Sequence, residues 1–219
     1  MTLTATAPDI SNAGAGTGID FGAPATDDTI FRTAAALRAR GMDVLIADDR
    51  EDARRLTLSL IPDGVEVNEG ASVTLDELGI SDDIRKATRF SALKPRIYGM
   101  DRATQMKEIR QLGSSPDVIV GSVHAITEDG QVVVASASGS QLAGYASGAG
   151  KVIWVVGSQK IVPDFETAMR RITEHTFPLE DARAQVVYGM HSALLKLLII
   201  NGERPGRISV VLLRDAVGF

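Results

Sequence analysis

The sequence predicts an α/β fold of three layers, in which helices flank a mostly parallel sheet within a single domain. Short apolar runs rich in Val and Ile alternate with amphipathic stretches, as in the strand Asp43–Ala47, the helix at 48–60 and the strand beginning at 65–67. Strands and helices that alternate at this spacing imply parallel pairing through right-handed crossovers. The length of 219 residues fits one domain with a substantial core.

The first 26 residues differ from the rest of the chain. They are rich in Ala, Gly, Thr, Pro and Asp and carry almost no bulky side chains. We therefore expect 1–26 to be a flexible tail and 27–219 to be the domain; the alternative is an arm that docks on a partner subunit. Asp27 or Asp28 is expected to cap the first helix, and Gly41 to end it.

The centre of the chain carries the clearest strand signals. Asp117–Ala125 is expected to form one buried strand and Gln131–Ala135 a second. A hairpin is expected at Asp129-Gly130, because both turn residues accept positive φ. A Gly/Ser/Ala stretch then leads to a third strand, Lys151–Val156, which ends at Gly157. Strand ends beside such small, polar turns are where α/β sheets place their ligands.

The remaining segments are mostly helical in pattern. The stretch 82–113 predicts irregular helices and is the most basic part of the chain. A solvated face is the ordinary interpretation of such charge, and steering of an anionic ligand is the alternative. Further helices are expected to start at Pro163 and at Pro178, the second continuing in broken form to Ile200. Arg207–Leu213 is predicted as the last strand.

Composition excludes several classes of function. The chain has no cysteine, which rules out disulfides, iron–sulfur ligation, thiolate catalysis and Cys-based zinc sites within it. His124, His175 and His191 are scattered, so we expect no metal site and no bound cofactor. A net charge of −5 argues against a general binder of nucleic acid or anionic membranes. With no secretory or membrane-spanning pattern visible, a cytoplasmic protein is expected.

Two loops carry the candidate site. In the loop Gly70–Thr74 the glycine allows close backbone approach, Ser72 and Thr74 offer hydroxyls, and the following helix offers free N–H groups to an anion; a plain helix cap is the alternative. Glu128 follows a buried strand, where desolvation would raise its pKa toward acid–base use; the alternative is an exposed hairpin residue. Because parallel strands bring their carboxyl ends to one edge, we expect this loop and Glu128 to face one cleft.

Three blocks of the sequence resemble the LUD (lactate-utilisation) domain family: Glu69–Gly79, Asp117–Gly130 and Val155–Val162. The resemblance runs from about residue 28 to the last residue. It implies the fold shared by ribose-5-phosphate isomerase, glucosamine-6-phosphate deaminase and CoA-transferases. Members of the family include a subunit of a bacterial L-lactate oxidation system whose other subunits carry the redox centres.

Two finer similarities bear on the site. The Gly70–Thr74 loop is similar to the phosphate-binding loop of sugar-phosphate isomerases. Thr127–Gly130 is similar to the Ser-Glu-Asn-Gly motif of CoA-transferases, whose glutamate is the nucleophile, and this implies a catalytic role for Glu128. The residues expected to bind a ligand are Gly70, Ser72, Thr74, Gly121, Gly157 and Lys160, and for Lys160 the alternative is a solvated side chain.

The leading functional expectation is a LUD-type protein of lactate or related organic-acid utilisation. It would bind a small anionic ligand, or serve as a non-redox partner of iron–sulfur or flavin oxidase subunits. A homodimer is one possible assembly, and the sequence does not decide the oligomeric state. One alternative is an enzyme that acts on phosphorylated or CoA-linked substrates, with Glu128 as acid, base or nucleophile. A purely structural accessory subunit is the third hypothesis. Because the chain lacks cysteine, it would need a bound cofactor or a partner to transfer electrons.

Overall fold

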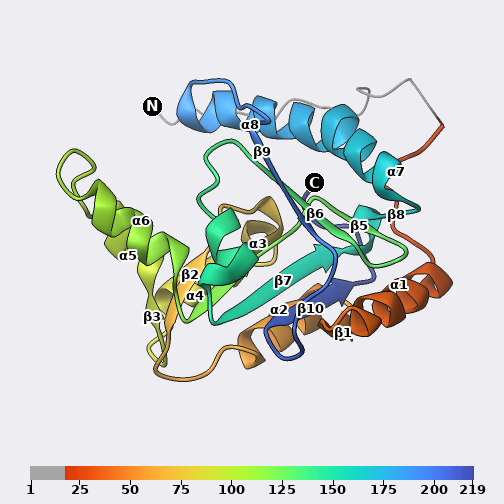
Figure 1. The fold of residues 1–219 in the computed structure, drawn as a ribbon, viewed down its shortest axis with the longest axis horizontal. Helices are drawn as coiled ribbons and strands as arrows, with labels where there is room; N and C mark the ends of the chain where they lie inside the picture. Colours follow the sequence, from red (N-terminus) through yellow and green to blue (C-terminus); the bar gives the residue numbers. More distant parts are fainter. Residues whose placement is uncertain (1–17) are drawn as a thin grey trace, which may run out of the picture.

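In the computed structural model, which describes residues 18–219, a six-stranded parallel sheet forms the centre of an α/β domain (Figure 1). The strand order is β1-β10-β7-β4-β2-β3. The strands are β1 (Asp43–Ala47), β2 (Glu66–Glu69), β3 (Ser91–Ala92), β4 (Val118–Gly121), β7 (Lys151–Gly157) and β10 (Ile208–Leu213). The predicted α/β fold with a mostly parallel central sheet is therefore confirmed.

Apolar side chains on both faces of this sheet hold the layers together. In β7, Val152, Trp154 and Val156 belong to one buried cluster, whereas Ile153 and Val155 belong to the cluster on the opposite face. Strands covered on both faces are continuously apolar, which is why the Val- and Ile-rich runs were recognisable as strands.

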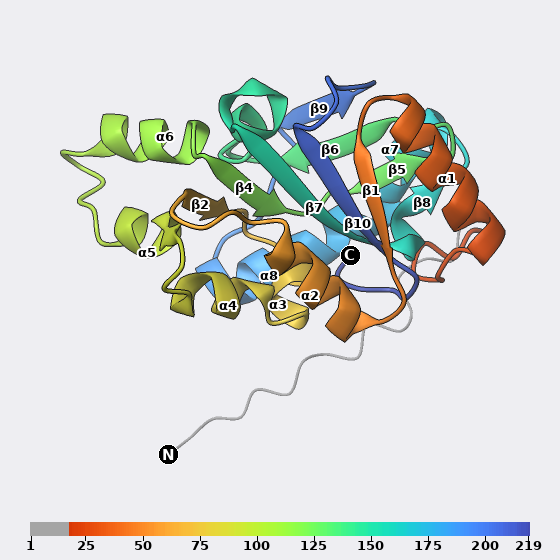
Figure 2. The ribbon, with the colours of Figure 1, turned by 90° about the horizontal axis from the view of Figure 1, so that it is seen from below.

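Helices cover the two faces unequally. On one side lie α2 (Arg50–Ser59), α3 (Val73–Glu77) and α4 (Ile80–Lys86), seen together in Figure 2, while α5 (Leu93–Tyr98) and α6 (Met106–Ser114) lie beyond the β3 end. On the other side lies α1 (Asp27–Ala39). Thr26, and not Asp27 or Asp28, caps α1, because its hydroxyl accepts the Thr29 N–H while both aspartates already belong to the first turn.

A second sheet completes the layer that contains α1, and the sequence did not predict it. Its order is β8-β5-β6-β9, with β5 (Ala125–Thr127), β6 (Val132–Ser136), β8 (Ile161–Val162) and β9 (Lys196–Ile200). The single strand expected at 117–125 is wrong, since the chain leaves the first sheet after Gly121 and enters the second at Ala125. The helical continuation expected to reach Ile200 is also wrong, because β6 pairs antiparallel with all five residues of β9.

The hairpin between β5 and β6 forms where Asp129-Gly130 predicts it, with a different turn. Only Gly130 has a positive φ, of 90°, and Asp129 does not. The Gly130 amide donates to the Thr127 carbonyl, and the Thr127 amide donates to the Gln131 carbonyl. This is the pattern of a three-residue loop whose last residue is a left-handed glycine.

One long helical segment covers the outer face of the second sheet. It consists of α7 (Phe165–Arg170), a π-helical stretch (Arg171–Thr176) and α8 (Phe177–Tyr188). A helix starts where Pro178 predicts one, because α8 carries this proline in its first turn, where its missing N–H has no helical partner to lose. The π-helical stretch joins α8 to α7 without an intervening loop. Gly189, with a φ of 67°, ends the segment.

Part of the segment that was expected to be a flexible tail contacts the domain. Of the expected tail, residues 1–17 lie outside the described part of the chain. Phe21 is buried in an apolar cluster with Val133 and Ile172, and the Ala25 amide donates to Ser158 Oγ at 3.1 Å. Phe21 and Ala25, both within the expected tail, are therefore in contact with the rest of the fold.

Candidate functional site

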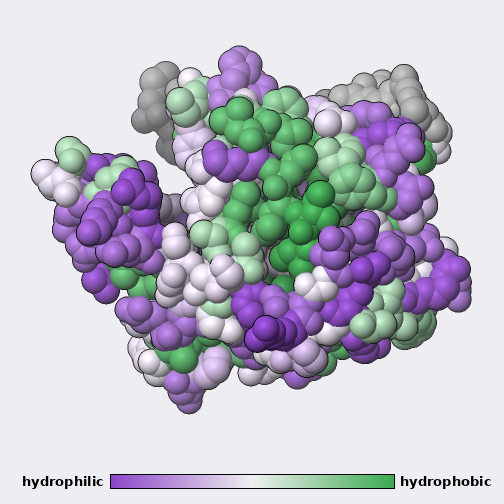
Figure 3. Space-filling model, in the orientation of Figure 1, coloured by the Kyte–Doolittle hydropathy of each residue, from purple (hydrophilic) through white to green (hydrophobic). Residues whose placement is uncertain are grey.

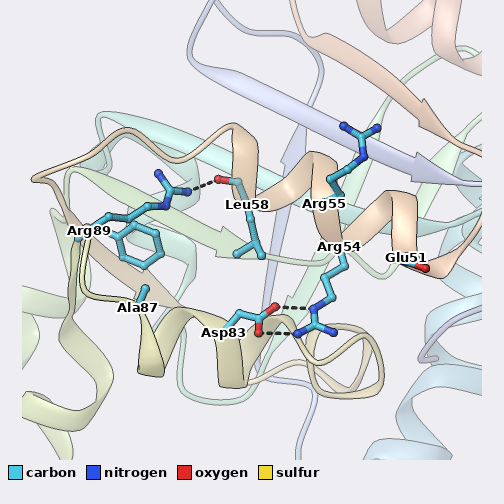
Figure 4. A pocket seen from close by; sticks show the side chains of 8 residues that line it. Glu51, Arg54, Arg55, Leu58, Asp83, Ala87 and Arg89 are labelled. Carbon is cyan, nitrogen blue, oxygen red and sulfur yellow. Dashed lines mark hydrogen bonds and ion pairs between the residues drawn. The ribbon is translucent and has the colours of Figure 1, made fainter.

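Two concave regions of the described chain have polar linings. The first, of about 450 Å³, lies between α2 and α4 and is lined by three arginines (Figure 4). Arg54 there points at Asp83 and bonds to it, and Arg89 donates to the carbonyl of Leu58. Arg55 is paired with Asp52. Since each guanidinium already has a partner within the fold, this groove is explained by structural ion pairs.

The second region, a cavity of about 730 Å³, has the character of a ligand site. Its walls come from the loop after β2, the residues that follow β4, the segment after β6 and the inner side of α8. Carboxyl ends of neighbouring parallel strands thus meet at this cavity, as expected for α/β sheets. Of the predicted ligand-binding residues, Ser72, Thr74 and Lys160 line it, whereas Gly70, Gly121 and Gly157 do not.

Lys160 is the most unusual group in the cavity wall. A 3₁₀ turn (Ser158–Lys160) after β7 brings it inward, and 1% of the residue is exposed. Its Nζ donates to Thr74 Oγ1 at 2.9 Å and to Ser122 Oγ at 3.1 Å, and it forms no ion pair with any carboxylate of residues 18–219. Burial, and then the nearby Arg171, lower the pKa of Lys160 to about 7, against a weaker opposing effect of Glu77.

A second buried cation supports this arrangement from behind. Arg171, in the π-helical stretch, donates to the His124 carbonyl at 2.6 Å, the Gln159 carbonyl at 3.3 Å and Thr176 Oγ1 at 2.9 Å. It thereby ties the turn that carries Lys160 to the segment between β4 and β5 that contains His124. Burial lowers its pKa to about 10, so it stays charged at neutral pH. The sequence does contain a sign that Arg171 is buried, because its helical spacing places it on the same face as the apolar residues Ala168 and Ile172.

The Gly70–Thr74 loop serves as both a cap and a wall of the cavity. Ser72 Oγ accepts the Leu75 N–H at 3.4 Å, so the helix-cap interpretation applies to it. Thr74 Oγ1 accepts from Lys160 and lies 3.4 Å from the Val217 carbonyl, to which it donates. Because α3 has only five residues, its backbone dipole is short, and the hydroxyls and Lys160 are the main polar groups here.

Two members of the basic stretch also line the cavity. Arg85 Nε lies 2.7 Å from Glu69 Oε1, and Lys94 Nζ lies 3.2 Å from the same oxygen. The Glu69 side chain is 1% exposed, and its second oxygen has no partner in the described structure. The cavity wall holds two side-chain carboxylates, those of Asp76 and Glu180. It holds four cationic side chains, which are Arg85, Lys94, Lys160 and Arg183. For Arg85 and Lys94, the purely solvated interpretation is therefore wrong.

Two neutral polar groups complete the interior. His124 Nδ1 accepts the Ala135 N–H at 3.1 Å, which leaves the proton on Nε2. Burial, helped by Lys160 and Arg171, lowers the pKa of His124 to about 3, so the ring is neutral at physiological pH. Burial also raises the pKa of Tyr145, whose hydroxyl lies so close to Gly121 that a Cβ there would be 1.7 Å away. Gly121 is therefore explained by packing.

Glu128 does not belong to this cavity. Its Oε2 accepts from Arg32 of α1 at 3.1 Å, and the turn beside it packs on α1, where a Cβ at Gly130 would be 2.9 Å from the Ala36 backbone. The expected cleft shared by Glu128 and the Gly70–Thr74 loop is therefore not formed. The reason is the split of the 117–125 strand, which carries Glu128 into the second sheet and away from the carboxyl edge of the first.

The fold and the cavity together define an α/β domain with a cation-rich site at the carboxyl edge of its parallel sheet. The sequence model of the LUD domain family matches residues 30–192, and the chain belongs to that family. The family's name refers to lactate utilisation, and the resemblance seen in the sequence is confirmed.

Among solved structures, one similar chain is a DUF162 family protein from Deinococcus radiodurans, with 12% identity and a TM-score of 0.51 over 85% of this chain and 96% of that one. This likeness shows the fold alone. Two Chaetomium thermophilum proteins, eIF2B beta (16% identity, TM-score 0.33, 55% and 44% coverage) and eIF2B delta (16%, 0.32, 66% and 57%), are too distant to carry an argument. No curated protein matches the sequence significantly.

Two further observations bear on the classes of function. Within residues 18–219 no three His, Asp or Glu side chains are grouped so that they could hold a metal ion. None of the described helices has the length and apolar character needed to cross a membrane.

Proposed function

We propose that this LUD domain binds a small organic anion in the cavity at Lys160, and that it acts in the utilisation of lactate or a related organic acid. The observation that carries the proposal is the buried Lys160 Nζ, held by two hydroxyls and without a carboxylate partner in the described chain. Burying a charge without a counter-ion is costly, and an anionic ligand would supply the missing charge.

The other polar groups of the cavity suit a hydroxy acid. Ser122 and Thr74 present hydroxyls beside Lys160, and His124 offers a neutral ring nitrogen with its proton on Nε2. A carboxylate would be attracted by the cation, and a neighbouring hydroxyl or carbonyl group by the neutral donors. The volume of about 730 Å³ exceeds what lactate needs, so larger or phosphorylated organic acids also fit.

Calorimetric titration of the full chain tests the proposal. The ligands are L-lactate, pyruvate, a longer 2-hydroxy acid and inorganic phosphate, each as the sodium salt. Lys160→Met should weaken binding of the preferred acid about 10- to 150-fold, the equivalent of a hydrogen bond to a charged group. Lys151→Met is the matched control, because Lys151 Nζ bonds to the Leu60 carbonyl and lies outside the cavity. Equal affinity in Lys160→Met and the wild type would contradict the proposal, and so would the absence of binding to every acid tested.

A role beside redox subunits follows from the same site. The chain has no cysteine to ligate an iron–sulfur cluster, so within an oxidation system it would act as a non-redox subunit that holds the acid. Co-expression with the products of neighbouring genes tests this. A stable complex with an iron–sulfur or flavin subunit that oxidises lactate only when this chain is present would support it. Full lactate oxidation without this chain would contradict it.

A second candidate function is catalysis by Lys160 instead of Glu128. A buried amine whose pKa is about 7 is partly neutral at physiological pH, and a neutral amine adds to the carbonyl of a 2-oxo acid. Addition followed by loss of one water would leave an imine, which borohydride reduces to a stable secondary amine. Mass spectrometry of protein treated with pyruvate and borohydride should then find the adduct on Lys160. Lys94, paired with Glu69 in the same cavity, is the internal control, and an unmodified Lys160 would rule this candidate out.

A further inference from the structure

Most of the large apolar side chains that are exposed in the described chain lie in β9, at the end of α8 or between the two. Residues 186–200 contain no acidic side chain and only two basic ones, His191 and Lys196. Seven large apolar side chains in this segment are between 42% and 81% exposed: Val186, Val187, Tyr188, Met190, Leu195, Leu197 and Ile199. Figure 3 shows an apolar area on the face across which β9 runs in Figure 1. We call these seven residues the β9 surface.

The backbone of β9 adds a second feature to this surface. β9 is the last strand of its sheet and pairs with β6 on one side only. Along its other side, the strand's N–H and C=O groups have no strand partner within residues 18–219. Charged side chains usually protect such an edge. Here the only charged residue of the strand, Lys196, bends back so that its Nζ donates to the Ala137 carbonyl.

We propose that a second copy of this chain covers the β9 surface, with the two β9 strands pairing antiparallel across a two-fold axis. An antiparallel pair of identical strands satisfies the symmetry of a dimer, because each residue then meets its own counterpart or a near neighbour. The seven side chains expose on the order of 700 Å², close to the roughly 800 Å² that each partner buries in a standard interface. A surface with so little charge also lacks the features that would select a charged partner.

The dimer would also complete the ligand cavity. Val187, Tyr188 and Met190 belong to the β9 surface and also line the cavity. A second copy seated on them would therefore cover part of the cavity wall and exclude water from it. Such exclusion strengthens the attraction between Lys160 and an anion.

The mass of the full chain in solution is the first test. Sedimentation equilibrium over a wide range of protein concentrations should give twice the chain mass of 23.2 kDa. Leu197→Lys combined with Ile199→Lys should halve that mass while the circular dichroism spectrum stays unchanged. Phe165→Lys, at an exposed aromatic residue on α7, is the matched control and should remain dimeric. A wild type that is monomeric throughout overturns the proposal, as does a dimer that survives the double substitution.

Single cysteine substitutions test the strand pairing itself. Unlike the two lysine substitutions, they place no charge in β9 that could unfold it. Because the chain has no natural cysteine, one cysteine at a time can be placed at each position from Lys196 to Ile200. Mild oxidation should cross-link the position nearest the two-fold axis far faster than the others, since Cα atoms of paired strands lie about 5 Å apart. Phe165→Cys should not cross-link. Equal and slow cross-linking at all five positions would overturn the proposed strand pairing.

Ligand affinity supplies an additional readout, and this part alone rests on the proposed function. The monomeric double variant should bind the preferred acid at least severalfold more weakly than the wild type. If the wild type is dimeric but binds no acid, the dimer stands and the proposed function fails. If the wild type binds acid as a monomer, the proposed function stands and the dimer fails.

Discussion

Replacing Lys160 with Met should make the free protein more stable at the same time as it weakens anion binding. The fold lowers the pKa of this lysine from 10.5 to about 7, mainly through burial. Each unit of pKa difference between the folded and the unfolded chain corresponds to about 1.4 kcal/mol. Keeping the charged lysine buried therefore costs on the order of 5 kcal/mol at low pH. Methionine has a similar length and carries no charge, and it suits irregular interior spaces.

The net gain is smaller than this cost, because the substitution also removes two hydrogen bonds. Thr74 and Ser122 each lose a bond from Lys160, worth about 1 kcal/mol each. Lys160→Met should therefore raise the free energy of unfolding by about 2–4 kcal/mol at pH 6, or several degrees in Tm.

The effect has a defined pH dependence. Below pH 7, Lys160 is charged in both the folded and the unfolded chain, and the folded state bears the full cost. As the pH rises from 7 toward 10.5, the folded lysine loses its proton before the unfolded one does, so the cost fades. Urea unfolding of both proteins at pH 6 and pH 9 measures this. A variant that is less stable at pH 6, or a stability difference that does not change with pH, would refute the reasoning.

Three further substitutions test separate parts of the structure. Phe21→Ala should lower the free energy of unfolding by about 3 kcal/mol in urea titrations, because Phe21 is buried; a loss below about 1 kcal/mol would restore the flexible-tail interpretation. Gly121→Ala should destabilise the fold by about 1–3 kcal/mol, since the new methyl group overlaps the Tyr145 hydroxyl, and wild-type stability would contradict the packing described. Glu128→Gln should leave anion affinity unchanged by calorimetry, because Glu128 pairs with Arg32 outside the cavity; a tenfold loss would return Glu128 to the site.

The parts of the fold that the sequence predicted well depend on local pattern. β7 and β10 are Val- and Ile-rich runs that are buried on both faces, and β1 is a shorter apolar run at the sheet edge. Such runs are recognisable without knowledge of their neighbours. β9 was missed because Lys196–Ile200 is a short apolar run without alternation, which fits a buried helix as well as a strand. The segment forms a strand because it pairs antiparallel with β6, which lies about 60 residues earlier in the chain, and the local sequence does not reveal this contact.

In the candidate site, too, the residues that local pattern marks were predicted, and those that depend on contacts between distant segments were not. Ser72, Thr74 and Lys160 were expected at the ligand because they follow strand ends, a position that the chain order alone reveals. Arg171 was not expected, because an arginine within a charged helical stretch resembles a solvated residue until the helix is packed on the second sheet. Glu128 was misplaced for a related reason, since nothing in the apolar run 117–125 marks the point at which the chain leaves the first sheet, and β5 pairs with β6 and β8 of the second sheet instead.

The most direct test of the central claim is an NMR titration of the Lys160 side chain in protein labelled with ¹³C-lysine. Its signal is assigned by comparison with Lys160→Arg and followed from pH 5 to 11, with and without a saturating organic acid. The account predicts a midpoint near pH 7 in the free protein, and a rise of at least one unit when the anion is bound, because a bound anion favours the charged form. A midpoint near the ordinary lysine value of 10.5, or one that the acid leaves unchanged, would contradict it.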